Sequence, residues 1–185
     1  MKYELRFHGI AKSLLMMLMT ALFLFSCGKD GGGGPTAPAA HATAHGTWEG
    51  VSVETKVQGP SCITLPGPTP IGATVVQIGA ILFITITDRH GISCSFHGTV
   101  GETTISWSAD QPQLSSCKGL QHVQCPGSNG SVRSVDTRLR SSDVGGSISG
   151  NHISVSGDVF WDVVDSNTGQ LIDTLRTDTH IELQR

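Results

Sequence analysis

Apolar and polar residues alternate along most of the chain from Gly46 to Arg185. A period of two is typical of strands that bury one face. The segment 171–183 shows it most clearly, and Asp165-Ser166-Asn167-Thr168-Gly169 before it predicts a hairpin turn. One face of this segment carries Leu175, Thr177, Thr179, Ile181 and Leu183, and the other carries Arg176, Asp178, His180 and Glu182. The pattern predicts a half-buried final strand.

The same period predicts strands in most of the preceding segments. A first strand begins near Trp48, with Val51, Val53 and Val57 on one face. Further strands are predicted over 75–78 and 81–87, which form a hairpin around Gly79-Ala80, and over 92–100, 132–140, 144–149 and 153–164. Ile105 and Trp107 line one face of another strand, which follows 92–100. Residues 109–130, with two prolines and two cysteines, are expected to form a loop. No segment here has the pattern of an amphipathic helix, so the sequence predicts an all-β domain.

Two segments of this domain repeat each other without gaps. Residues 98–108 align with residues 146–156, and each copy has the pattern of a hairpin. Gly150-Asn151 is a favourable turn dipeptide in the second copy. Similar hairpins along one chain favour an up-and-down antiparallel meander of eight to ten strands. Closure into a small barrel would remove the sheet edges, and a β-sandwich is the alternative fold.

The start of the first predicted strand carries a family resemblance. Gly46-Thr47-Trp48 resembles the Gly-x-Trp motif of lipocalins and of lipocalin-like bacterial lipoproteins. The resemblance implies a lipocalin-like barrel whose closed end is plugged by Trp48. It also implies that a basic residue near the last strand packs over this indole, and Arg185 and Arg176 are the two candidates.

The N-terminus has the pattern of an export signal. Lys2, Arg6 and Lys12 precede the apolar run 14–25, which is shorter than the roughly 20 residues that a membrane-spanning helix needs. The run ends in Leu24-Phe25-Ser26-Cys27, which resembles the lipobox of bacterial lipoproteins. This resemblance implies that residues 1–26 are a lipoprotein signal peptide and that Cys27 is the lipid attachment site. Gly28, rather than Asp, after the cysteine implies the outer membrane.

Residues 27–45 would then be the lipidated cysteine and a flexible tether rich in Gly, Pro and Ala, followed by the barrel domain over 46–185. Residues 27–185 contain 9 Lys and Arg against 14 Asp and Glu, a net charge of −5. A mildly acidic domain argues against nucleic acid as a partner. The expected location is the cell envelope, with the protein attached to a membrane through Cys27.

Four cysteines remain when Cys27 is assigned to the lipid: Cys62, Cys94, Cys117 and Cys125. An even number is typical of disulfides in an oxidising compartment. Of the three possible connectivities, we favour Cys117–Cys125 with Cys62–Cys94, since a disulfide within the loop 109–130 would stiffen it. A zinc site formed by all four cysteines is the less favoured alternative, because no two of them have the close spacing of a zinc knuckle.

No motif for catalysis, a cofactor or a metal occurs in the sequence. There is no nucleophile elbow, no metalloprotease helix motif and no phosphate-binding loop, and the histidines are scattered over different predicted elements. We therefore expect a protein that is not an enzyme and has no cofactor. One hypothesis is a barrel whose cavity binds a small apolar or amphipathic ligand. The other is a solid barrel that acts through contacts with another envelope protein, with residues 109–130 as the contact surface.

Overall fold

The computed structural model describes residues 40–109, 117–127 and 130–185, so Cys27 and the signal-like segment lie outside the described residues. In the described part the chain forms nine strands and no α-helix. The strands are β1 (Gly46–Gln58), β2 (Thr69–Ile78), β3 (Ile81–Asp88), β4 (Ser93–Val100), β5 (Thr104–Ala109), β6 (Val123–Pro126), β7 (Val132–Ser149), β8 (His152–Asp165) and β9 (Leu171–Gln184).

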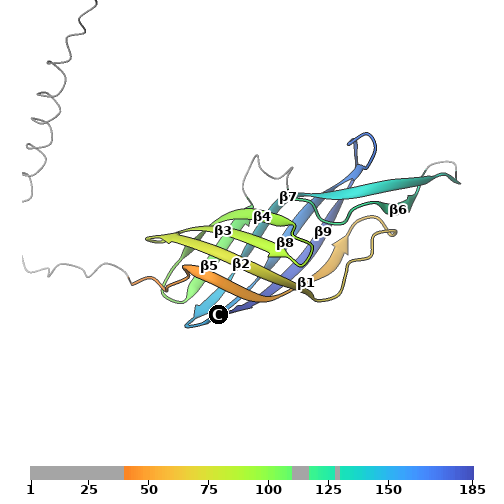
Figure 1. Cartoon of the computed structure of the whole chain (residues 1–185). Coiled ribbons are helices and arrows are strands. Elements are labelled where there is room, and N and C mark those ends of the chain that lie inside the picture. The colour runs from red at the N-terminus through yellow and green to blue at the C-terminus, as the bar shows by residue number, and fades with distance from the viewer. Residues whose placement is uncertain (1–39, 110–116, 128–129) are drawn as a thin grey trace, which may run out of the picture. The chain divides into compact units, whose positions relative to one another are not determined.

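Eight of these strands form a closed antiparallel barrel (Figure 1). Each pairs with its neighbour in the order β1-β2-β3-β4-β5-β7-β8-β9, and β9 pairs with β1. The ring closes between β5 and β7, where Trp107 lies opposite Val144. The closed up-and-down barrel confirms the predicted fold and excludes the β-sandwich alternative, because no strand of this ring has a free edge.

Two details of the strand prediction are wrong. The expected loop 109–130 contains the short strand β6, which pairs only with the first residues of β7. The two strands predicted over 132–140 and 144–149 are one long strand, β7. A bulge between Leu139 and Ser141 shifts the alternation by one residue, so Leu139 and Ser142 both face inward. A bulge keeps the strand paired while bending it, which a strict period of two does not anticipate.

The sequence repeat corresponds to two equivalent hairpins, β4–β5 and β7–β8. Gly98 lies opposite Trp107 in the first hairpin, and Gly146 lies opposite Val155 in the second. At both glycines an added Cβ would collide with a carbonyl oxygen of the neighbouring strand. The repeat therefore preserves a position at which the barrel wall bends too sharply for a side chain.

The inward faces of the strands are mostly the predicted ones. Leu82 and Ile84 of β3, Ile105 and Trp107 of β5, and the predicted apolar face of β9 are buried. The exception is β1, where the face shared by Val51, Val53 and Val57 points outward and is exposed. Trp48 is fully buried, and because side chains alternate along a strand, Ser52 and Glu54 face the barrel interior with it.

Trp48 closes one end of the barrel with help from both ends of the domain. Its indole N–H donates to the carbonyl of Ala44, which is fully buried, 2.8 Å away. The Arg185 guanidinium lies over the indole ring, 4.5 Å from its centroid, and donates to the carbonyls of Thr43 and His45. Arg185 therefore has the position expected of the basic residue. Arg176 does not, because it pairs with Asp158.

The chain begins to pack on the barrel before the predicted domain start at Gly46. Ala42 donates its N–H to the carbonyl of Gly101, and the amide group of Gln77 bonds to both Ala42 and Ala44. These contacts place residues 42–45 across the closed end. Residues 27–39 of the predicted tether lie outside the described residues.

All four predicted cysteines form disulfides, but the favoured pairing is wrong. The bonds are Cys62–Cys125 and Cys94–Cys117. Cys117 and Cys125 are close in sequence, yet Cys117 packs into the barrel core whereas Cys125 on β6 packs into a second cluster with Ile63, Val135 and Leu175. That second cluster lies where β7, β8 and β9 continue beyond the barrel, so Cys62–Cys125 fastens the β1–β2 loop to this extension.

Candidate ligand-binding cavity

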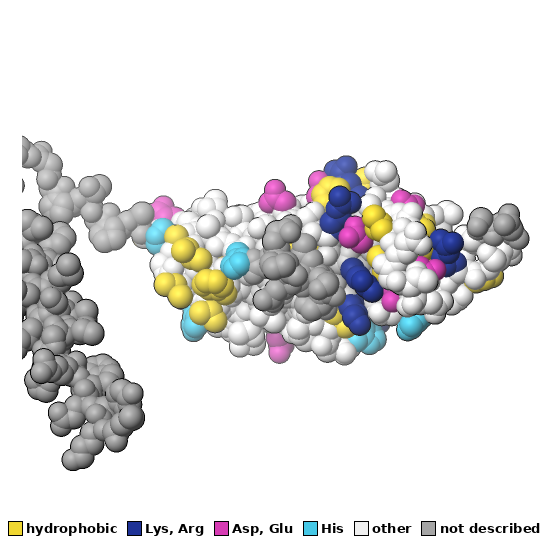
Figure 2. All heavy atoms as spheres, turned by 90° about the horizontal axis from the view of Figure 1, so that it is seen from above, with side chains coloured by type: hydrophobic (Ala, Val, Ile, Leu, Met, Phe, Trp, Pro, Cys, Tyr) yellow, Lys and Arg dark blue, Asp and Glu magenta, His cyan; other side chains and the backbone are white. Residues whose placement is uncertain are grey.

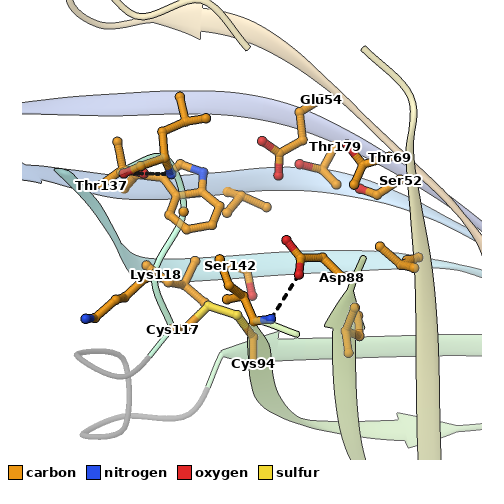
Figure 3. Close-up of a pocket in the computed structure, with 18 of the residues that line it drawn as sticks. Ser52, Glu54, Thr69, Asp88, Cys94, Cys117, Lys118, Thr137, Ser142 and Thr179 are labelled. Atoms are coloured by element: carbon orange, nitrogen blue, oxygen red, sulfur yellow. Dashed lines mark hydrogen bonds between the residues drawn. A yellow bond between two sulfur atoms is a disulfide. The ribbon is translucent and has the colours of Figure 1, made fainter. Parts of the chain in front are cut away.

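The end of the barrel opposite Trp48 contains a cavity of about 620 Å³ (Figure 3). All eight strands of the ring contribute side chains to its wall. Its volume lies within the range of about 300–1,000 Å³ that is usual for small-molecule sites. Eight-stranded barrels of this kind can hold one small ligand.

Most of the cavity wall is apolar. Two tryptophans line it, together with aliphatic and aromatic residues from opposite sides of the barrel. The main apolar contributors are Ile71, Ile86, Phe96, Trp107, Val144, Val159, Trp161 and Ile181. Such a wall favours the hydrocarbon part of a ligand, at roughly 25 cal/mol for each Å² removed from water.

Loops and turns surround the mouth of the cavity. Leu65 and Pro66 come from the β1–β2 loop, Arg89 and His90 from the β3–β4 turn, and Lys118 from the segment that precedes β6. Arg89, His90 and Lys118 are exposed, so the basic side chains at the mouth are in contact with solvent.

The wall also has a polar strip formed by β1 and its two neighbours. Glu54 is the register partner of Thr179 on β9, and Ser52 is the register partner of Thr69 on β2. All four line the cavity, and Figure 3 shows the Glu54 carboxylate on the same side of the cavity as the hydroxyls of Thr179, Thr69 and Ser52. One carboxylate and three hydroxyls therefore interrupt an apolar surface.

Glu54 makes no hydrogen bond or ion pair with any residue that the structure describes. The nearest lysine along the same face of β1, Lys56, donates instead to the carbonyls of Pro60 and Ile63. Glu54 is half-buried in the wall, and this partial burial without a compensating cation disfavours the charged carboxylate. It raises the pKa of Glu54 from 4.5 to about 7.

The other acidic residue of the cavity wall has partners. Asp88 accepts hydrogen bonds from the backbone N–H groups of His90 and Ile92, so it shapes the β3–β4 turn. Ser142, in contrast, has a buried hydroxyl with no hydrogen-bond partner among the described residues. Buried polar groups are nearly always paired in native proteins. Glu54 and Ser142 are thus polar groups of the wall that a ligand could satisfy.

The residues predicted from sequence and the cavity overlap only in part. Cys94–Cys117 lines the cavity, whereas Cys62–Cys125 does not. Glu54 is not among the site residues predicted from the sequence. The signal was present, because Trp48 at the closed end and a period of two place residue 54 inside the barrel, but the valines of β1 suggested the opposite face.

Comparisons of the chain with protein-family models, with curated proteins and with solved structures find no match. The described residues include no helix long and apolar enough to cross a membrane. Nor do they contain a group of three or more His, Cys, Asp or Glu side chains that could hold a metal ion. The two disulfides indicate an extracytoplasmic protein, since such bonds persist in oxidising compartments.

Proposed function

We propose that this protein is an exported, lipid-anchored binding protein of the cell envelope, whose barrel holds one small apolar or amphipathic molecule. The observation that carries the proposal is the apolar cavity of about 620 Å³, which opens at one end of the barrel. Nucleic acid is not a partner in this proposal, and neither catalysis nor a cofactor is required. The alternative, a solid barrel that acts only through contacts with another envelope protein, does not predict such a cavity.

The arrangement of the closed end supports attachment near a membrane. The chain enters the barrel there, where Gln77 of β2 bonds to Ala42 and Ala44. The tip of the adjacent β2–β3 hairpin has an exposed apolar outer face, and exposed apolar side chains gather at one end of the molecule (Figure 2). That hairpin face consists of Val76, Ile78, Ile81 and Phe83. An apolar surface beside the incoming chain suits contact with lipid.

Ligand binding predicts a stable extra mass on the protein. The chain from Gly28 to Arg185, which contains every residue that the structure describes, is exported to a periplasm and purified without detergent. A native mass spectrum is expected to show a bound molecule that denaturation releases, because the apolar cavity favours hydrocarbon over water. A bare polypeptide mass, with no uptake of added long-chain alcohols, would favour the solid-barrel alternative.

The anchor predicts that an alkyne-tagged fatty acid fed to expressing bacteria labels the full chain. Replacing Cys27 with Ser is expected to abolish the label, because the thioether cannot form on a hydroxyl. Replacing Cys62 and Cys125 together with Ser serves as the control and should retain it. Label that persists after Cys27→Ser, or an unlabelled native chain, would refute attachment at this cysteine.

A further inference from the structure

We propose that the cavity selects an amphipathic cation, with the Glu54 carboxylate as the counter-ion of an ammonium or amidinium head group and the apolar wall around the hydrocarbon tail. The proposal rests on the proposed binding function and specifies the class of ligand for that same cavity. Three features of the cavity carry it.

The first feature is the isolation of the carboxylate. Glu54 lies on the inner face of a barrel strand, lines the cavity and has no described partner, while Lys56 is engaged by the β1–β2 loop. A buried carboxylate without a partner is costly, and a cation of the ligand would remove that cost. Among the described residues, the one other acidic side chain that lines the cavity is Asp88, and it is bonded to its turn.

The second feature is the set of hydroxyls beside the carboxylate. Thr179 is the cross-strand partner of Glu54, and Ser52 and Thr69 form the next pair on the same wall. Hydroxyl oxygens accept hydrogen bonds from an ammonium group, which has up to three N–H donors. The hydroxyl oxygens of the strip can thus accept hydrogen bonds from those ammonium N–H groups that do not bond to the carboxylate.

The third feature is the position of this strip relative to the apolar wall. Glu54 is six residues along β1 from Trp48, or about 20 Å of extended strand. The carboxylate therefore lies towards the open end, with apolar residues such as Ile71, Phe96 and Trp107 also on the wall. A head group at Glu54 leaves this apolar surface for a tail.

Other charged groups of the cavity do not replace Glu54 in this role. Neither β2 nor β9, the strands beside β1, contributes a charged side chain to the wall, and β3 contributes only Asp88. Arg89 in the β3–β4 turn and Lys118 before β6 are exposed to solvent, where their charges are screened, and His90 beside Arg89 is exposed as well. They would attract an anionic head group only at the mouth.

The test compares three probes of equal chain length below their micellar concentrations: dodecylammonium, dodecanol and dodecanoate. Quenching or shift of the fluorescence of Trp107 and Trp161 on the cavity wall reports binding to the chain from Gly28 to Arg185. We expect dodecylammonium to bind at least about tenfold more tightly than dodecanol. Its affinity should rise about tenfold between about pH 5.5 and pH 7.5, because the ionised carboxylate is the binding form.

Three substitutions on β1 make the test specific. Glu54→Gln should remove the preference for dodecylammonium and its pH dependence while leaving dodecanol binding unchanged. Glu54→Asp should retain part of the preference. Glu49→Gln is the matched control, because Glu49 lies on the same strand but is exposed on its outer face, and it should behave as wild type.

The outcomes separate this inference from the proposed function. Tight binding of dodecanol or dodecanoate with no preference for the cation, unaffected by Glu54→Gln, would overturn the inference and leave the binding function standing. Binding of none of the three probes would overturn both. A preference for dodecylammonium that Glu54→Gln abolishes and Glu49→Gln retains would support the inference.

Discussion

Replacing Cys62 and Cys125 together with Ser is expected to lower the free energy of unfolding by about 4 kcal/mol. The bond closes a loop with a sequence separation of 63 residues, and a cross-link over that length removes a large part of the conformational freedom of the unfolded chain. It also fastens the β1–β2 loop, through the buried Ile63, to the extension formed by β6 to β9. Denaturant titration of variant and wild type measures the difference.

The matched comparison is Cys94→Ser with Cys117→Ser. This bond has a sequence separation of 23 residues, so the same reasoning gives a smaller loss of about 3 kcal/mol. Because Cys94 and Cys117 line the cavity, this variant should also weaken binding of the long-chain probes. Non-reducing peptide mapping supplies a direct check. A peptide that links Cys117 to Cys125 would contradict the pairing on which both expectations depend.

The disulfides show where sequence reasoning fails in this chain. The sequence favoured a bond within the loop 109–130, between Cys117 and Cys125. In the fold, the segment after Cys117 runs along β7, with Gly119 bonded to Thr137, before β6 begins. The two cysteines therefore face different clusters. Which cysteines meet depends on contacts between distant strands, and a local pattern carries no information about them.

The strands themselves were predictable where one face is apolar. The alternation of β9 fixed its inward residues, and the Gly79-Ala80 turn fixed the β2–β3 hairpin. β6 was missed because it is only four residues long, ends in a proline and pairs with one neighbour. A strand that short depends on the β7 extension and the nearby disulfide rather than on its own pattern.

The orientation of β1 has the greatest consequence for function. Its valines face outward because Trp48 must fill the closed end, where Arg185 and Ala44 hold it. A single large buried side chain outweighs the preference of three valines that remain partly solvent-exposed on the barrel surface. The same choice turns Glu54 inward, so a packing requirement at one end places a carboxylate in the cavity at the other.

Replacing Glu54 with Gln is expected to make the empty barrel more stable by about 3 kcal/mol at about pH 8. Burial raises the pKa of Glu54 in the folded protein to about 7, against 4.5 in the unfolded chain. Between these values the unfolded chain releases a proton that the folded protein retains, so rising pH favours unfolding. The wild type should thus lose this stability between about pH 4.5 and pH 7, and Glu54→Gln should not.

Denaturant titrations at several pH values measure this difference, with Glu49→Gln as the control. The carboxyls of Asp165 and Glu182 affect the stability of the protein in a different pH range. Hydrogen bonds from the backbone of Thr168 and from the Ser154 hydroxyl, respectively, lower their pKa values, so their stabilisation is lost only in acid. Every other titrating group is common to both proteins and cancels in the difference. If the free energy of unfolding depends on pH in the same way for Glu54→Gln and wild type, the Glu54 carboxyl is not a buried, unpaired group.

The direction of this effect bears on why the carboxylate is present. Replacing a residue with a structural role lowers the stability of the protein. Glu54→Gln, by contrast, is expected to raise the stability of the protein and to weaken its binding of cations. Residues that destabilise the empty protein are typical of functional sites, where a ligand offsets the cost. Saturating dodecylammonium should therefore stabilise the wild type more than the variant. The difference between their free energies of unfolding at about pH 8 should become smaller. If dodecylammonium leaves this difference in free energy unchanged, Glu54 is not the counter-ion of the bound cation.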